Sequence, residues 1–232
     1  MAGSGFGTNF RITTWGETHG AGVGVVVDGC PAGLSLERED VQKYLDRRKP
    51  GQSKYTTQRK EGDQVEILSG IFEGRTTGTP ISMVVYNKDQ RSKDYSNIKD
   101  IYRPGHADFT FDMKYGFRDY RGGGRSSGRE TIGRVAAGAV AAKVLKELGI
   151  EIKAYAKAIA GIEVSKDHFD FAEMNNNPFN MPDKEAAKLV QEKADQMIKE
   201  MDSIGGIIEC QITGMPVGIG ETVFDKLDAE LS

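Results

Sequence analysis

The sequence predicts a layered α+β fold in a single domain over residues 1–232. Short β-prone runs mix with helical patterns without a regular βαβ rhythm, which disfavours a doubly wound parallel sheet. The 232 residues are 38% hydrophobic and 28% charged, an ordinary globular composition that can bury one large core or two smaller ones. Since no internal repeat or low-complexity linker divides the chain, we expect one domain.

The N-terminal part predicts a pair of strands and a helix. The runs 10–15 and 23–28 are short, β-prone and bracketed by glycines. A helical pattern begins after Ser35 and carries apolar side chains on one side. Pro50, followed by glycine, ends that helix.

Two further strands, 65–72 and 81–86, lead into a segment of a different character. Residues 87–125 have little periodicity but many charges, aromatic side chains and glycines. A stretch this long without regular structure is usually functional. We therefore expect the functional site in this segment.

The C-terminal part alternates helices and strands. The clearest helix spans 129–148, shows an alanine- and glycine-rich surface that permits close packing, and stops at Gly149. Asp183 is placed to cap an amphipathic helix that runs to Met201. Strands are expected on either side of this helix, at 150–159 and 204–213.

The two cysteines and the N-terminus indicate an ordinary soluble protein. Cys30 and Cys210 lie far apart without metal-type spacing, so we expect two buried thiols and neither a disulfide nor a metal site. The N-terminus lacks a signal peptide pattern, and no apolar run is long enough to span a membrane. A cytoplasmic protein without membrane association is the expectation.

Positive charge is concentrated locally although the formal net charge is −3. Residues 47–60 hold six cations and no acid, and residues 118–134 hold five arginines against two acids. Such runs are usually solvated surface. Arginines crowded beside a glycine loop, however, repel one another unless an anion lies among them.

That glycine loop runs from Arg121 to Thr131 and leads into the strong helix. Three consecutive glycines expose backbone N–H groups, the helix start adds its dipole, and serines and arginines add donors. The alternative is a flexible loop with a serine cap. The loop is neither a Walker motif nor a dinucleotide fingerprint. Its composition indicates a phosphate or carboxylate site.

Histidine is scarce, and two of the three histidines lie on glycine-flanked turns. His19 lies in GETHG and His106 in RPGHAD, which makes both candidates for proton transfer. His168 has no comparable setting and is expected to be structural or exposed. A metal site is not indicated, because no HxH or HExxH spacing occurs.

These motifs resemble those of chorismate synthases. GETHG is similar to the family's GESHG signature, with Thr18 in place of serine. The stretch 103–141 resembles the family's central signature, and DRRKPGQSKYTTQR, at 46–59, resembles its basic substrate-side segment. The likeness covers the whole chain, which stops at Ser232, before the family's later flavin-binding stretches and its RHDP-type signature. It implies a β-α-β sandwich with mainly antiparallel sheets, incomplete at the C-terminus.

The resemblance also implies a reaction and its cofactor. The family converts 5-enolpyruvylshikimate 3-phosphate to chorismate by 1,4-elimination of phosphate and needs reduced FMN; some members reduce their own flavin with NADPH. A homotetramer is implied as well. By position, the resemblance gives His19 and His106 catalytic roles, Arg125, Ser126 and Ser127 flavin contacts, Arg48 and Lys54 NADPH contacts, and Arg48, Arg129 and Arg134 substrate contacts. Lys54 stands where the family commonly has arginine, which removes a bidentate donor.

Two alternatives remain open at this point. The arginines suit a non-enzymatic module that binds a polyanion such as nucleic acid, although GETHG, RPGHAD and the acidic balance are unexplained by it. The chain can also be an inactive fragment of the enzyme. No nucleic-acid partner is expected.

Overall fold

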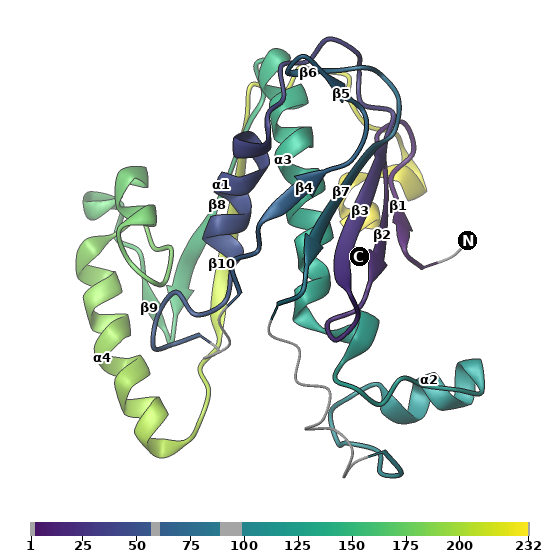
Figure 1. Cartoon of the computed structure of the whole chain (residues 1–232). Helices are drawn as coiled ribbons and strands as arrows, with labels where there is room; N and C mark the ends of the chain where they lie inside the picture. Colours follow the sequence, from purple (N-terminus) through teal and green to yellow (C-terminus); the bar gives the residue numbers. More distant parts are fainter. Residues whose placement is uncertain (1–2, 57–60, 89–98, 232) are drawn as a thin grey trace. The chain divides into compact units, whose positions relative to one another are not determined.

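The computed structural model describes residues 3–56, 61–88 and 99–231, shown in Figure 1. They fall into two compact units that divide between Val144 and Leu145. The organisation of the whole chain as one domain stays a prediction. Every site residue proposed from the sequence lies in the first unit.

The regular elements match an α+β architecture with antiparallel sheets, as predicted. The strands are β1 (Gly5–Phe6), β2 (Arg11–Gly16), β3 (Gly22–Asp28), β4 (Val65–Ile67), β5 (Ile71–Phe72), β6 (Arg75–Thr76), β7 (Ile81–Tyr86), β8 (Glu151–Ile159), β9 (Ile162–Glu163) and β10 (Gly206–Thr213). The helices are α1 (Arg38–Arg48), α2 (Asp108–Tyr115), α3 (Thr131–Glu147), α4 (Lys184–Glu200) and α5 (Leu227–Leu231). Short 3-10 turns are η2 (Gly124–Ser126), η3 (Gly128–Glu130), η4 (Lys166–His168), η5 (Phe171–Asn175) and η6 (Val223–Asp225).

The first unit is built on a five-stranded antiparallel sheet in the order β1-β2-β3-β7-β4. Strand alternation in β3 buries Val23, Val25 and Val27 on one face. These valines share a core with α1 and with α3, which lies along this face of the sheet (Figure 1). The pair of strands and the helix predicted for the N-terminal part are therefore confirmed.

The small-residue surface of α3 explains how closely the helix lies on the sheet. A β-carbon on Gly133 would lie 2.9 Å from Thr14 Cγ2 and 3.1 Å from the Gly24 carbonyl oxygen. Ala136 and Ala139 are buried beside it. The close approach places the N-terminus of α3 against β2, which carries the loop before α3 onto the GETHG turn.

The second unit packs α4 on the three-stranded sheet β10-β8-β9. Ala186, Ala187 and Val190 of α4 contact Ala156 of β8 in a small apolar core. Asp183 caps the helix as predicted, because its carboxylate accepts the backbone N–H groups of residues 185 and 186.

Three expectations from the sequence need correction. The strand expected at 65–72 is two strands, β4 and β5, broken at Gly70, whose φ of +82° lies in the left-handed region. The segment 87–125 is not without regular structure, since it contains α2; its residues 89–98 lie outside the described residues. Cys30 is buried as expected, but Cys210 is exposed on β10.

Candidate active site

The two motifs that the sequence singled out meet in the first unit. Thr18 of the GETHG turn donates a hydrogen bond from Oγ1 to the Gly124 carbonyl, 3.3 Å away. The His19 ring lies against Gly122, where a β-carbon would come within 2.3 Å of Cδ2. Arg125 Nη1 donates to the Gly16 carbonyl at 3.2 Å. The GETHG turn and the glycine loop therefore form one structure.

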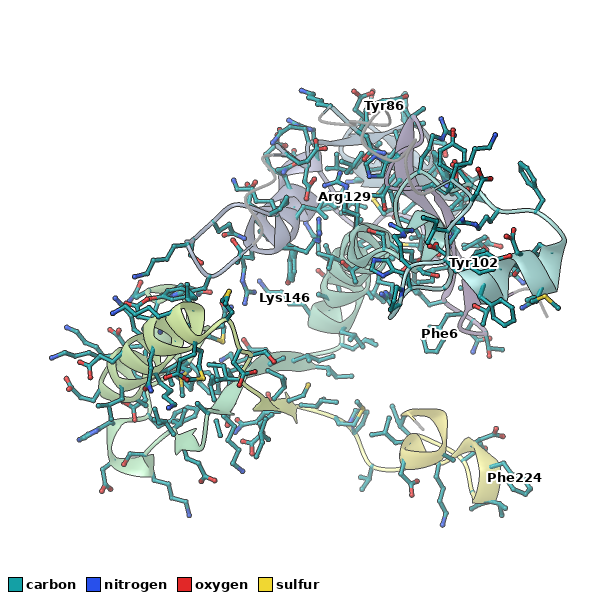
Figure 2. All side chains as sticks on the ribbon, turned by 90° about the horizontal axis from the view of Figure 1, so that it is seen from below. Phe6, Tyr86, Tyr102, Arg129, Lys146 and Phe224 are labelled. Carbon is teal, nitrogen blue, oxygen red and sulfur yellow. The ribbon has the colours of Figure 1, made fainter. Side chains whose placement is uncertain are left out.

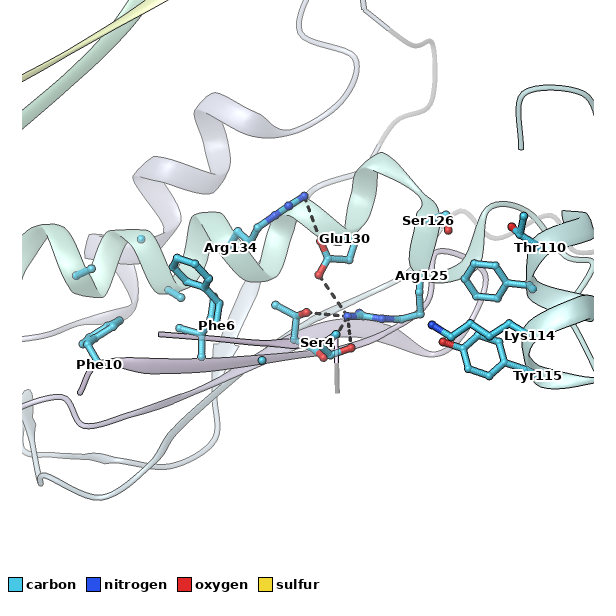
Figure 3. Close-up of a pocket in the computed structure, with 18 residues that line it drawn as sticks. Ser4, Phe6, Phe10, Thr110, Lys114, Tyr115, Arg125, Ser126, Glu130 and Arg134 are labelled. Atoms are coloured by element: carbon cyan, nitrogen blue, oxygen red, sulfur yellow. Dashed lines mark hydrogen bonds and ion pairs between the residues drawn. The ribbon is translucent and has the colours of Figure 1, made fainter. Parts of the chain in front are cut away.

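Arg125 anchors the glycine loop to β2 (Figure 3). Its Nη2 lies 2.7 Å from Thr14 Oγ1, 3.2 Å from the Thr14 carbonyl and 3.2 Å from Ser4 Oγ, with Glu130 Oε1 at 3.3 Å. These acceptors enclose one end of the guanidinium group. Since the guanidinium is occupied by protein acceptors, its first role in the structure is to hold the loop.

The RPGHAD turn is held by an ion pair between its first and last residues. Arg103 donates to Asp108 from Nε to Oδ2 at 2.8 Å and from Nη2 to Oδ1 at 2.9 Å, a bidentate pair. The hydrogen bond from Arg103 holds the pKa of Asp108 well below its usual range. Arg118 forms a second ion pair with Asp108, with Nη1 3.3 Å from Oδ2.

Arg103 also connects this turn to the glycine loop. Its Nη2 donates to the Gly122 carbonyl at 2.8 Å. His106 stands on the turn between the two ends of the ion pair and is exposed, with Nδ1 3.1 Å from the Pro104 carbonyl oxygen. The buried His19 and the exposed His106 thus lie on turns that contact the same glycine loop.

A second cluster, at the start of α3, is buried and centred on Asp63. The Asp63 side chain has no solvent exposure and accepts from Arg48 Nη1 at 2.6 Å and Arg129 Nη1 at 2.9 Å. Arg129 is 5% exposed and also donates from Nη2 to Asn87 Oδ1 at 3.1 Å. Figure 2 shows Arg129 among the side chains of the first unit.

Asn87 joins the Asp63 cluster to the GETHG turn. Its Nδ2 donates to the carbonyls of Glu17 and Gly20, both at 2.9 Å, and its backbone N–H donates to the Ala21 carbonyl. The carbonyls of Glu17 and Gly20 flank Thr18 and His19. One amide side chain therefore fixes both ends of the turn that carries His19.

Two cavities adjoin the glycine loop. The larger, about 1250 Å³, is bounded by β1, β2, α2 and α3 and is lined by aromatic and apolar side chains together with Lys114, Arg125, Ser126, Glu130 and Arg134 (Figure 3). The smaller, about 630 Å³, is lined by His106, Arg103, Arg118 and the loop from Gly122 to Gly128. Arg125 and Ser126 line both cavities.

The arginine-rich segment 118–134 differs from expectation in one respect. The sequence predicts that an anion lies among its arginines and that the loop binds a phosphate or carboxylate; in the structure, protein carboxylates lie among these arginines. Each of the five is paired: Arg118 with Asp108 and Asp112, Arg121 with Asp119, Arg125 and Arg134 with Glu130, and Arg129 with Asp63. Because each of these arginines already pairs with a protein carboxylate, the structure disfavours an open cationic surface that binds nucleic acid through them.

The remaining candidates have distinct positions. Ser126 is exposed, whereas Ser127 accepts a hydrogen bond from the Arg129 N–H and lines the smaller cavity only. Arg134 is 61% exposed and extends from α3 beside the larger cavity. The Lys54 ammonium stands over the Tyr55 ring, 5.1 Å from its centroid. In the described part of the chain, neither cavity is lined by Arg48, Lys54 or Arg129.

Sequence reasoning missed the acceptors that organise the site. Asp63 and Asn87 stand at the ends of irregular or strand segments, where no periodicity marks them. Asp108 lies inside the recognised RPGHAD motif, and its pairing with Arg103 could have been expected from charge and proximity. Among the residues that the structure describes, no three His, Cys, Asp or Glu side chains gather to hold a metal ion, and no helix is long and apolar enough to cross a membrane.

Comparison with known proteins decides the family. The family model described as "Chorismate synthase" matches residues 10–232. The chain belongs to the chorismate synthase family. The match includes both the GETHG turn and the glycine loop, so the contacts between these two motifs lie within the shared part.

Curated relatives align over the entire chain. A chorismate synthase of Lachnospira eligens is 68% identical and one of Agathobacter rectalis is 62% identical, each over 100% of this chain and 63% of the relative. A chorismate synthase of Chloroflexus aggregans is 57% identical with the same coverage. The chain therefore spans 63% of the length of these chorismate synthases.

A solved structure supports the fold. The structure titled "Crystal Structure of Chorismate Synthase" matches with a TM-score of 0.73 and 31% identity, over 92% of this chain and 60% of that chain. Antiparallel sheets and helices arranged as described here are thus those of a chorismate synthase.

Proposed function

We propose that this protein acts as a chorismate synthase: a lyase that eliminates phosphate from 5-enolpyruvylshikimate 3-phosphate in aromatic amino-acid biosynthesis. The observation that carries the proposal is the contact between the GETHG turn and the glycine loop, in which Thr18 binds Gly124 and His19 packs on Gly122. Family membership supports the reaction, and this contact supports the two motifs as its site.

The cavities fit the cofactor that the family uses. A reduced flavin combines a flat aromatic ring with an anionic phosphate. The larger cavity offers Phe6, Phe111 and Tyr115 for a ring, and Lys114 and Arg134 for a negative charge. Ser126 Oγ, at the junction of both cavities, is available as a hydrogen-bond donor. When bound, reduced FMN would supply electron density to the substrate as its bond to phosphate breaks.

The protein's own groups would bind the anionic substrate and move protons. In the elimination, a ring C–O bond breaks and phosphate departs with the bonding electrons. A ring carbon releases a proton that ends in the solvent, and the electrons of its C–H bond form the new double bond. His19 and His106, on turns that share one loop, are the proposed proton donors. Arg48, Arg129 and Arg134 are the proposed source of positive charge for the carboxylates and phosphate.

The remaining proposals follow the family. Arg125, Ser126 and Ser127 would position the flavin, Arg125 mainly by holding the loop on which the serines stand. Arg48 and Lys54 would contact NADPH if the protein reduces its own flavin. A homotetrameric assembly and a cytoplasmic location are part of the same proposal.

Anaerobic turnover tests the proposed function. The protein is mixed with 5-enolpyruvylshikimate 3-phosphate and dithionite-reduced FMN, and released phosphate and chorismate absorbance are followed. We expect equimolar phosphate and chorismate with reduced FMN and none with oxidised FMN. Equal rates with and without flavin would exclude the mechanism.

A further inference from the structure

Asp63 is a buried acidic residue that has no role in the proposed function. Its side chain is fully buried, and its backbone φ of +42° lies in the left-handed region, which asparagine and aspartate tolerate better than other non-glycine residues. Gln42 of α1 fixes the segment around it, donating to the Asp63 carbonyl at 3.2 Å and accepting from the Val65 N–H at 3.0 Å. The chain therefore holds a buried carboxylate in a set position.

That carboxylate is divided between two arginines from different elements. Oδ2 binds Arg48 at the end of α1, and Oδ1 binds Arg129 just before α3. Two positive charges and one negative charge leave a net charge of +1 for the three side chains. The Asp63 carboxylate thus sets the distance between Arg48 and Arg129 and reduces their combined charge. The proposed function gives both arginines a contact with the substrate.

The same carboxylate reaches His19 through two further contacts. Arg129 uses one nitrogen for Asp63 and another for Asn87, and Asn87 binds the carbonyls on either side of Thr18 and His19. The guanidinium group is planar and rigid, so fixing Nη1 fixes the direction of Nη2. The position of Asp63 therefore influences the position of the GETHG turn through Arg129 and Asn87.

We infer that Asp63 is a positioning residue: it spaces Arg48 and Arg129 for an anionic substrate and, through Arg129 and Asn87, fixes the turn that carries His19. The inference rests on the proposed function for the identity of the anion. Arg129 then has two roles: it contacts the substrate, as expected from the sequence, and it connects Asp63 to Asn87.

Asp63→Asn in the protein as it stands tests this inference. Asparagine keeps the size, tolerates the positive φ and retains one acceptor, but it removes the charge. Asp28→Asn is the matched control, because it makes the same change in net charge at an exposed carboxylate paired with Arg11. The probe is inorganic phosphate, measured by calorimetric titration.

The second measurement is the imidazole signal of His19 in heteronuclear NMR. The chain has three histidines, so the signal can be assigned from His19→Ala, and His168, in the second unit, serves as an internal reference. Neither measurement requires turnover. Failure of the proposed chemistry and failure of this inference are therefore distinguishable.

With Asp63→Asn, we expect phosphate to bind about threefold to tenfold more tightly, because the net charge of the three side chains at positions 48, 63 and 129 rises from +1 to +2. We also expect the His19 signal to shift. Tighter phosphate binding separates positioning from a folding defect, which would weaken phosphate binding. An unmoved His19 signal, or phosphate affinity equal to that of Asp28→Asn, overturns the inference.

Asn87→Ala provides the second test if Asp63→Asn does not fold. This variant breaks the link to the turn and leaves the two arginines on Asp63. We expect the His19 signal to shift while phosphate affinity stays within about twofold of the original protein. An unmoved His19 signal in folded Asn87→Ala overturns the proposed route.

Discussion

The His19 ring packs directly on Gly122, two residues that lie on separate motifs of the sequence. A β-carbon at Gly122 would lie 2.3 Å from His19 Cδ2 and 2.7 Å from Nε2, and the φ of Gly122 is +79°. Both facts require glycine at this position. The need for glycine at the start of the loop therefore comes from contact with the His19 ring and from the backbone conformation.

Gly122→Ala is expected to displace His19 and to destabilise the first unit. The methyl group would meet the ring and add backbone strain, which together should lower the free energy of unfolding by about 2–4 kcal/mol. Gly116→Ala separates the two effects, since Gly116 has a φ of +70° but open space around its β-position. Urea unfolding of both variants measures the difference. Equal losses would show that strain alone matters and that the ring contact is unimportant.

The ionisation of Asp108 should make the free energy of unfolding depend on pH in the acidic range. The hydrogen bond from Arg103 holds the pKa of Asp108 well below its usual value. The folded protein therefore keeps this carboxylate ionised at pH values where the unfolded chain binds a proton. The stabilisation is complete above about pH 4 and is lost as the pH falls further, through the depressed pKa. Unfolding free energy measured from pH 7 downward should show this fall.

Asp108→Asn should remove that part of the acid dependence. It should also cost about 3–5 kcal/mol at pH 7, because the buried Arg118 and the half-buried Arg103 lose a shared carboxylate. Asp119→Asn is the control, since Asp119 pairs with Arg121 near the surface and its loss should cost under about 1 kcal/mol. An acid dependence unchanged in Asp108→Asn would contradict the assignment.

The fold was predictable where a local pattern coincides with burial. Val23, Val25 and Val27 alternate along one strand, and Asp183 precedes an amphipathic run; both patterns formed the expected elements. Gly70 shows the limit. A glycine inside a β-prone run is compatible with a continuous strand or a break, and the choice here depends on Ile81 of β7, whose side chain a β-carbon at Gly70 would meet at 2.6 Å.

The sequence predicts two motifs that carry the site, but not how they are connected. That GETHG and the glycine loop carry function stays a prediction, and their contact through Thr18 and Gly124 supports it. The partners of the arginines were not foreseen. Asp63 reaches Arg129 across 66 positions of sequence, and such pairing depends on tertiary packing that no local spacing encodes.

The two histidines should differ in what their loss does to stability. Alanine at either position is expected to lower kcat by about 10²-fold or more if both transfer protons. His106 is exposed, so His106→Ala should change the free energy of unfolding by less than about 0.5 kcal/mol, whereas His19→Ala removes a buried ring and should cost more. Turnover and urea unfolding of each variant check this, with His168→Ala as the control. Wild-type turnover in either variant would refute its catalytic role.

Arg125 and Ser126 are neighbours with different roles, and paired variants should separate them. Arg125→Lys replaces a guanidinium that contacts Thr14, Ser4 and Glu130, so it should lower the free energy of unfolding by about 1–3 kcal/mol. Ser126→Ala removes an exposed hydroxyl at the edge of both cavities and should leave stability within about 0.5 kcal/mol. If the hydroxyl contacts flavin, the same variant should weaken FMN binding about threefold to tenfold, the effect of one hydrogen bond, as measured by quenching of flavin fluorescence. Unchanged FMN affinity in Ser126→Ala would remove this serine from the flavin site and leave the loop with the anchoring role that Arg125 gives it.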